Sequence, residues 1–193
     1  MRIRIILAIL AFFLINYSAP AQPKYRGFAE AGYDVFLGSK AGSEYQISTS
    51  HGVLLNGSVF VGAGLGCSYY SIDNPGDDPD FVLPEGQDGM GVFTGVEKFT
   101  GVSVPVFLNI KYLWNRNKLV TVTDLKLGLS AGYVTGWFLE SGLGLGIKIS
   151  EESTLFAFPF VKYAYEPNNI VTDDSQYTEG NFTSLGLKLV FEF

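Results

Sequence analysis

The sequence predicts an all-β fold, an eight-stranded antiparallel up-and-down transmembrane β-barrel. The clearest strand is the last, residues 182–193, where leucines and phenylalanines occupy one face and Lys188 and Glu192 the other. Short and longer connections alternate along the eight predicted strands. After the N-terminal segment, no apolar run reaches the ~20 residues that a membrane-spanning helix requires.

The first three strands are predicted over residues 25–37, 44–55 and 58–72. In the first, Tyr33 and its apolar neighbours oppose Glu30 and Asp34. The second alternates less clearly but ends at Asn56-Gly57, a strong hairpin signal. In the third, glycines fill one face, and we expect them to leave room for large side chains from opposite strands of a narrow barrel.

Strands four and five are predicted over residues 102–114 and 119–131, and strands six and seven over 137–149 and 154–165. Strands four to six each set an apolar face against a face that carries charged residues or glycines. The seventh is apolar on both faces, and we place Lys162 inward. Pro105 and Pro159 each remove a ladder donor, so we expect β-bulges there.

Short connections fall at residues 56–57, 115–117 and 150–153, and the others at 38–43, 73–101, 132–136 and 166–181. Short periplasmic turns alternating with longer extracellular loops are typical of outer-membrane barrels. The even number of strands then places both termini in the periplasm.

The N-terminus has the features of a signal peptide over residues 1–21. Arg2 and Arg4 precede an apolar stretch, residues 5–15, and Ala19-Pro20-Ala21 forms a small-x-small cleavage site. The alternative, a membrane anchor helix, is disfavoured because the apolar stretch is short. The barrel domain then covers residues 22–193. The residue directly after the cleavage site is Gln22 rather than a cysteine, so we do not expect a lipoprotein anchor.

Charge excludes one class of partner. The chain of 193 residues has a formal net charge of −6, and removal of the two signal-peptide arginines leaves 11 basic against 19 acidic residues. Nucleic-acid binding needs a basic footprint, so no nucleic acid is expected. Cys67 is the only cysteine, which excludes an internal disulfide.

The two faces of the strands predict the candidate residues. Charges of both signs are expected inside the barrel, where an unpaired charge is costly: Glu30, Asp34, Lys111, Asp124, Lys126, Glu140, Lys148, Lys162, Lys188 and Glu192. Aromatic residues near strand ends are expected at the membrane interfaces: Trp114, Trp137, Tyr163, Phe191 and Phe193. Eight strands enclose a space just wide enough for side chains, so we expect no continuous channel. A soluble lipocalin-like barrel with inverted faces is the structural alternative.

The segments SVPVFLNIKYLW, GWFLESGLGLGIKI and SLGLKLVFEF carry a family resemblance. The chain resembles the small OmpA/OmpX-type barrels, and in particular the outer-membrane β-barrel domain proteins of Bacteroidetes. This resemblance implies an outer-membrane location, contact with the lipid bilayer and lipopolysaccharide, and recognition of Phe182–Phe193 by the outer-membrane assembly machinery. It carries no catalytic motif, and we do not expect cell-wall tethering through a peptidoglycan-binding domain.

We therefore expect a non-catalytic protein, structural or interaction-presenting through its acidic loops, with no cofactor and an unknown extracellular partner. The first alternative is a small solute-binding or channel-forming barrel. The second is a lipid A-modifying enzyme that uses His51, although Ser50 and His51 are adjacent in a strand and so point to opposite faces. Weak divalent-cation binding by Asp73, Asp77, Asp78 and Asp80 is a further hypothesis, although their spacing is not that of an EF-hand.

Overall fold

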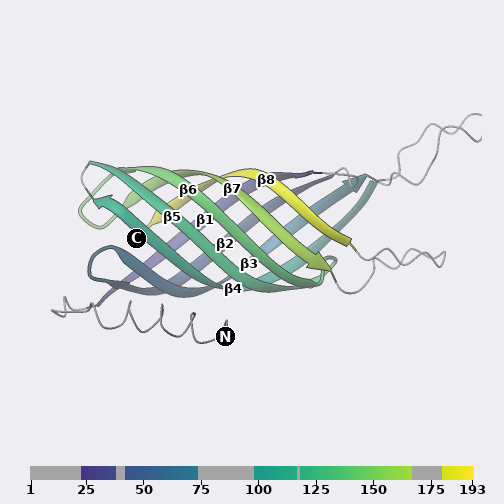
Figure 1. Ribbon diagram of the computed structural model, residues 1–193, viewed down its shortest axis with the longest axis horizontal. Coiled ribbons are helices and arrows are strands. Elements are labelled where there is room, and N and C mark those ends of the chain that lie inside the picture. Colours follow the sequence, from purple (N-terminus) through teal and green to yellow (C-terminus); the bar gives the residue numbers. More distant parts are fainter. Residues whose placement is uncertain (1–22, 38–41, 74–97, 117, 167–179) are drawn as a thin grey trace, which may run out of the picture.

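The chain forms a closed antiparallel barrel of eight strands in sequence order (Figure 1). The structure is a computed structural model, which describes residues 23–37, 42–73, 98–116, 118–166 and 180–193. The strands are β1 (Lys24–Leu37), β2 (Gly42–Leu55), β3 (Val59–Asp73), β4 (Lys98–Arg116), β5 (Leu119–Gly132), β6 (Gly136–Lys148), β7 (Thr154–Glu166) and β8 (Gly180–Glu192). β8 pairs with β1 and closes the sheet. The predicted fold class, including the number and order of strands, is confirmed.

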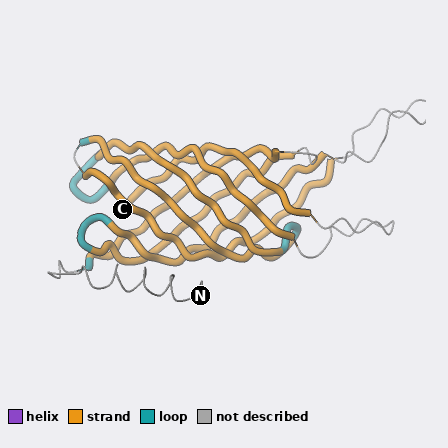
Figure 2. Tube along the Cα trace, viewed as in Figure 1, coloured by secondary structure: helices purple, strands orange, loops and turns teal. Residues whose placement is uncertain are grey.

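Nearly all of the described chain is strand, joined by short loops at the ends of the barrel (Figure 2). Among the described residues there is no helix long and apolar enough to cross a bilayer. The expected signal peptide, residues 1–21, lies outside the described residues. So do most of the two acidic connections, residues 74–97 and 167–179.

The hairpin between β2 and β3 is built as the sequence predicts. Asn56 and Gly57 have φ values of 50° and 68°, and the Ser58 amide donates to the Leu55 carbonyl over 3.0 Å. Positive φ at both central residues is the type I′ geometry, which matches the twist of the flanking strands. The turn fixes the register of β2 against β3, with Leu54 opposite Phe60.

The expected bulges at the two prolines are wrong. The register of β3 against β4 is the same on both sides of Pro105, and that of β6 against β7 is the same on both sides of Pro159. Each ladder instead omits two residue pairs beside the proline, because a proline has no amide hydrogen to donate. The register irregularity in the described ladders lies between Leu113 and Asn115 of β4.

The outward face is apolar around the whole barrel. Leucine, valine, isoleucine and aromatic side chains on it are typically about half exposed, as Leu187 is at 58%. The inward face of β7 is the one that carries Lys162, as the sequence analysis placed it. An apolar outer surface around a charged interior is the arrangement of a membrane-spanning barrel, and closure gives every strand a pairing partner on both edges.

Glycines make room for the phenylalanines that fill the interior. A Cβ atom at Gly64 would lie 2.5 Å from the Phe107 ring, and one at Gly144 would lie 2.6 Å from the Phe158 ring. In both cases the ring comes from the neighbouring strand rather than from across the barrel, which differs from the expectation. A ring that lies along the wall over a cross-strand glycine fits a narrow tube.

Polar residues lie between two apolar clusters in the interior. Along β1, Phe28 belongs to the first cluster and Phe36 to the second, and Glu30 and Asp34 lie between them. The first cluster, toward the chain termini, contains Phe28, Leu54, Phe60, Leu113, Val120, Val122, Phe156, Phe158 and Val190. The second, toward the opposite end, contains Phe36, Tyr70, Ile72, Phe107, Val134, Phe138, Ala164 and Phe182. The inward charges of the middle of the barrel are thus enclosed between apolar layers.

Candidate functional site

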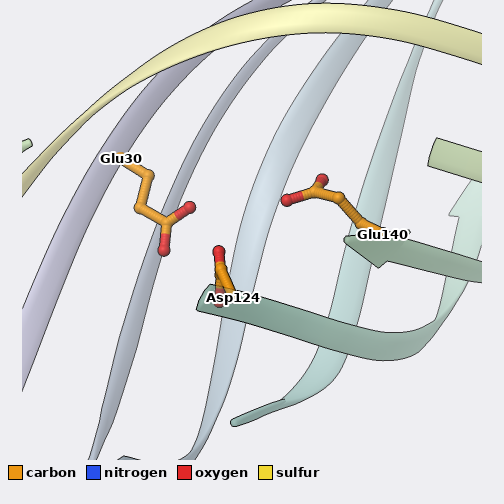
Figure 3. A group of neighbouring side chains, drawn as sticks. All are labelled: Glu30, Asp124 and Glu140. Atoms are coloured by element: carbon orange, nitrogen blue, oxygen red, sulfur yellow. The ribbon is translucent and has the colours of Figure 1, made fainter. Parts of the chain in front are cut away.

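Three carboxylates converge in the middle of the interior. Glu30 of β1, Asp124 of β5 and Glu140 of β6 point toward one another (Figure 3), and one oxygen of each lies within 4.8 Å of the others. Their side chains come together because each strand turns alternate residues inward. We call these three carboxylates and the three lysines that contact them, Lys111, Lys126 and Lys188, the central ionic layer.

Lys188 is the hub of the central ionic layer. Its Nζ lies 3.2 Å from Glu30, 2.6 Å from Asp124 and 2.5 Å from Glu140. Lys188 comes from β8, so these contacts tie the last strand to β1, β5 and β6.

The other two lysines complete the pairing. Lys111 Nζ lies 3.0 Å from Glu30 and 2.9 Å from Asp124. Lys126 Nζ lies 2.6 Å from Glu30 and 3.3 Å from Glu140. Three positive and three negative charges therefore balance within one layer, which is the condition under which buried ions are tolerated.

Aromatic rings surround the lysines on their other sides. Lys111 Nζ lies 5.0 Å from the centroid of Phe28, Lys126 Nζ 4.8 Å from that of Phe107, and Lys188 Nζ 5.2 Å from that of Phe158. A cation over an aromatic face is attracted by the ring quadrupole, and more strongly where water is excluded. The phenylalanines therefore fill the interior and also solvate the ammonium groups.

The three carboxylates do not make a good metal centre. A hard cation such as Ca²⁺ requires several free oxygen ligands, whereas Glu30 Oε1 and Oε2 and both oxygens of Asp124 already contact lysine ammonium groups. A metal ion at this point would also face three positive charges. The arrangement is a structural ion network.

A second charged group lies nearer to the end opposite the termini. Lys162 Nζ of β7 donates to Glu44 over 2.7 and 2.6 Å and to the Tyr70 hydroxyl over 3.4 Å. Asp34 of β1 is the cross-strand partner of Glu44. At the terminal end, Arg26 Nε lies 3.6 Å from Glu192. The interior therefore holds charged groups at three levels along the barrel axis, with the central ionic layer in the middle.

Nine of the ten residues expected inside are buried, and Lys148 is not. Its expected interior position is wrong, because it is the last residue of β6 and its side chain is exposed where the barrel ends. Sequence reasoning also missed two buried charges, Arg26 and Glu44. Arg26 lies two residues before the inward-facing Phe28, so strand alternation places it on the same face. The hairpin at Asn56-Gly57 fixes which residues of β2 face inward, and the same alternation then places Glu44 inside.

The interior is filled by its own side chains. The charged residues of the central ionic layer are at most 6% exposed, and apolar clusters enclose that layer on both sides. The described residues therefore offer ions no open aqueous path, which weighs against the channel-forming alternative.

His51 lies on the outward face near the terminal end. Its Nδ1 contacts the Tyr25 hydroxyl at 2.5 Å and its Nε2 contacts Thr49 Oγ1 at 3.0 Å. Thr49 Oγ1 donates its proton to the Phe28 carbonyl over 3.1 Å. With the Thr49 proton on that carbonyl, a neutral imidazole donates to Thr49 from Nε2 and accepts from Tyr25 at Nδ1. In this arrangement His51 does not act as a base toward Thr49, and the geometry disfavours the lipid A-modifying alternative.

The aromatic residues expected at the membrane interfaces point outward. Trp114, Phe191 and Phe193 lie near the end that holds the chain termini. Near the other end, Trp137 contacts the Tyr163 ring at a tilt and stacks with Tyr165. The Phe193 ring covers Gly27, and the backbones of these two residues exchange hydrogen bonds of 2.9 Å. The C-terminal residue thus completes the seam between β8 and β1.

The fold, the apolar exterior and the charged interior define the chain as an eight-stranded membrane-spanning β-barrel. Among solved structures, it is similar to the crystal structure of Neisserial surface protein A, with a TM-score of 0.51 and 13% sequence identity. The match covers 89% of this chain and 97% of that one. At this identity the likeness shows the fold alone. No family model and no curated protein matches the chain.

Removal of Lys188 should destabilise the barrel strongly. Lys188→Met leaves three buried carboxylates facing two lysines, and breaking a buried ion network costs about 3–5 kcal/mol. The matched control is Lys148→Met, which removes an exposed lysine and should change stability by less than about 0.5 kcal/mol. Denaturant unfolding of both variants in detergent micelles measures the difference. Equal effects of the two substitutions would contradict the central ionic layer.

Proposed function

We propose that the chain is a non-catalytic outer-membrane protein whose barrel holds two acidic connections at the cell surface. The single observation that carries the proposal is the strand order of the filled barrel. In an up-and-down barrel, the connections between β3 and β4 and between β7 and β8 leave from the same end. Residues 73–101 contain seven acidic side chains and residues 166–181 contain four, which together are eleven of the nineteen in the chain. Loops on a rigid scaffold are where binding is usually located.

The orientation of the barrel is part of this proposal. With residues 1–21 as a signal peptide and both termini in the periplasm, the short connections at residues 56–58 and 149–153 face the periplasm. The acidic connections then face outward. The aromatic residues at the two ends of the outer surface support a membrane-spanning placement with one interface at each end, because tryptophan and tyrosine prefer the bilayer interfaces.

The outward-facing connections would lie beside lipopolysaccharide, whose phosphates carry negative charge. Acidic loops next to phosphates need divalent cations between them, and clusters such as Asp77, Asp78 and Asp80 supply the oxygen ligands that Ca²⁺ prefers. In the same proposal, the segment Phe182–Phe193 is recognised by the assembly machinery. The seam that Phe193 makes with Gly27 gives this segment a role in closing the barrel.

Surface labelling tests the orientation. In a Cys67→Ala background, Gly89→Cys places a thiol in the acidic connection and Glu152→Cys places one in a short connection at the opposite end. A membrane-impermeant thiol reagent should label position 89 on intact cells, and position 152 only after permeabilisation. Labelling of position 152 but not of position 89 on intact cells would show that the barrel has the opposite orientation.

Neutralising the acidic connection tests the contact with lipopolysaccharide. The triple variant Asp77→Asn, Asp78→Asn and Asp80→Asn should bind immobilised lipopolysaccharide several-fold more weakly in Ca²⁺, because exposed charge contacts contribute roughly 0.2–1 kcal/mol each. Chelation of Ca²⁺ should weaken wild-type binding to the same level. The control, Glu151→Gln with Glu152→Gln, removes acidic charge at the opposite end and should bind like wild type. Binding that is independent of Ca²⁺ and of the triple change would contradict the proposed contact.

A further inference from the structure

The buried charges of the described interior do not balance. Six carboxylates and five cationic side chains are buried, and within the central ionic layer three of each sign compensate one another. Arg26 and Glu192 pair at the terminal end. The surplus negative charge therefore belongs to the remaining group, which contains Asp34, Glu44 and Lys162.

Asp34 is the carboxylate without a cation. Its side chain is 1% exposed, and Oδ2 accepts a hydrogen bond of 2.6 Å from the Ser184 hydroxyl. The other oxygen, Oδ1, is buried with no hydrogen-bond partner. In the described part of the chain, no lysine or arginine nitrogen lies within 4.0 Å of Asp34, the limit for an ion pair.

The nearest cation is committed to Glu44. Both oxygens of Glu44 accept hydrogen bonds from Lys162 Nζ, at 2.7 and 2.6 Å, and the third hydrogen bond of that ammonium goes to the Tyr70 hydroxyl at 3.4 Å. Asp34 and Glu44 face each other across neighbouring strands with both side chains inward. Two buried carboxylates thus share one positive charge.

Within the described residues, the other strands bring no further ion pair to Asp34. Of the charged groups that interact most strongly with Asp34, Lys162 of β7 is positive, and Glu44 of β2 and Glu140 of β6 are negative. Tyr70 of β3 contributes a hydroxyl. The lysine of β8, Lys188, is held by the three carboxylates of the central ionic layer.

A buried carboxylate without a compensating cation is costly, and the ordinary way to remove that cost is to take up a proton. We propose that Asp34 carries a proton at neutral pH, so that Asp34, Glu44 and Lys162 form a neutral proton-binding centre in the half of the interior remote from the termini. Ser184 supplies a donor to Oδ2 only, so an ionised Asp34 would leave Oδ1 buried with neither a donor nor a cation to compensate its charge.

The position of this centre connects the protonation of Asp34 with the pairing of β1 and β8, which closes the barrel. Asp34 lies on β1 opposite Gly186 of β8, where a Cβ atom would approach the Asp34 Cβ to 2.5 Å, and its hydrogen bond crosses the same seam to Ser184. Ionisation would place an uncompensated charge beside the seam. Because the folded protein keeps a proton that an unfolded aspartic acid releases at acid pH, stability should fall as the pH rises until Asp34 ionises in the folded barrel.

Infrared spectroscopy of the folded barrel in detergent tests the proton directly. At pH 7, wild type should show the carbonyl band of a protonated carboxylic acid, and this band should disappear at high pH. Asp34→Asn should lack the band. Glu44→Gln should also lack it, because Lys162 is then free to pair with an ionised Asp34. The control Glu151→Gln changes an exposed carboxylate and should keep the band.

The pH dependence of the thermal midpoint is the second measurement. Between pH 5 and pH 9 the wild-type midpoint should fall, whereas that of Asp34→Asn should be flatter. A wild-type spectrum without the band at pH 7, or a band that survives in Asp34→Asn, would overturn the proposal. If Asp34→Asn does not fold, the loss of the wild-type band with rising pH, and its loss in Glu44→Gln, decide the question.

Discussion

The ion pairs of Lys188 with Glu30, Asp124 and Glu140 join four strands in the middle of the barrel. A barrel of eight strands has an interior that side chains must fill. Here the filling is charged, so each ion needs a partner at contact distance. The lysine from the last strand meets carboxylates from three other strands, and the network therefore holds distant parts of the sheet in one register.

The exterior imposes the complementary constraint. Lipid offers no hydrogen bonds, so the strands must satisfy one another around a closed ring and present apolar side chains outward. Closure depends on the seam between β8 and β1, where Phe193 packs on Gly27 and exchanges backbone hydrogen bonds with it. The same seam carries Asp34 and Ser184 on its inner side. The inner and outer constraints therefore meet at the strand pair that closes the barrel.

The sequence predicted the fold well because a period of two is visible wherever one face is uniformly apolar. That signal placed Glu30, Asp124 and Lys188 on the inward face without any structure. It could not show which charges meet, because the pairing of Lys188 with three strands depends on the tilt and stagger of the closed sheet. Lys148 was wrongly placed inside because the alternation of faces does not show where a strand leaves the barrel. The prolines were misjudged because a ladder can omit two pairs without changing its register.

The most direct test of an apolar exterior around a charged interior is the mobility of the protein on cold SDS gels after detergent extraction of the membrane fraction. We expect the protein to require detergent and the unboiled sample to run faster than the boiled one, because a closed barrel with a compensated interior resists SDS until heated. A protein that is soluble without detergent and shows no shift would contradict it, since the apolar faces would then have to line an interior.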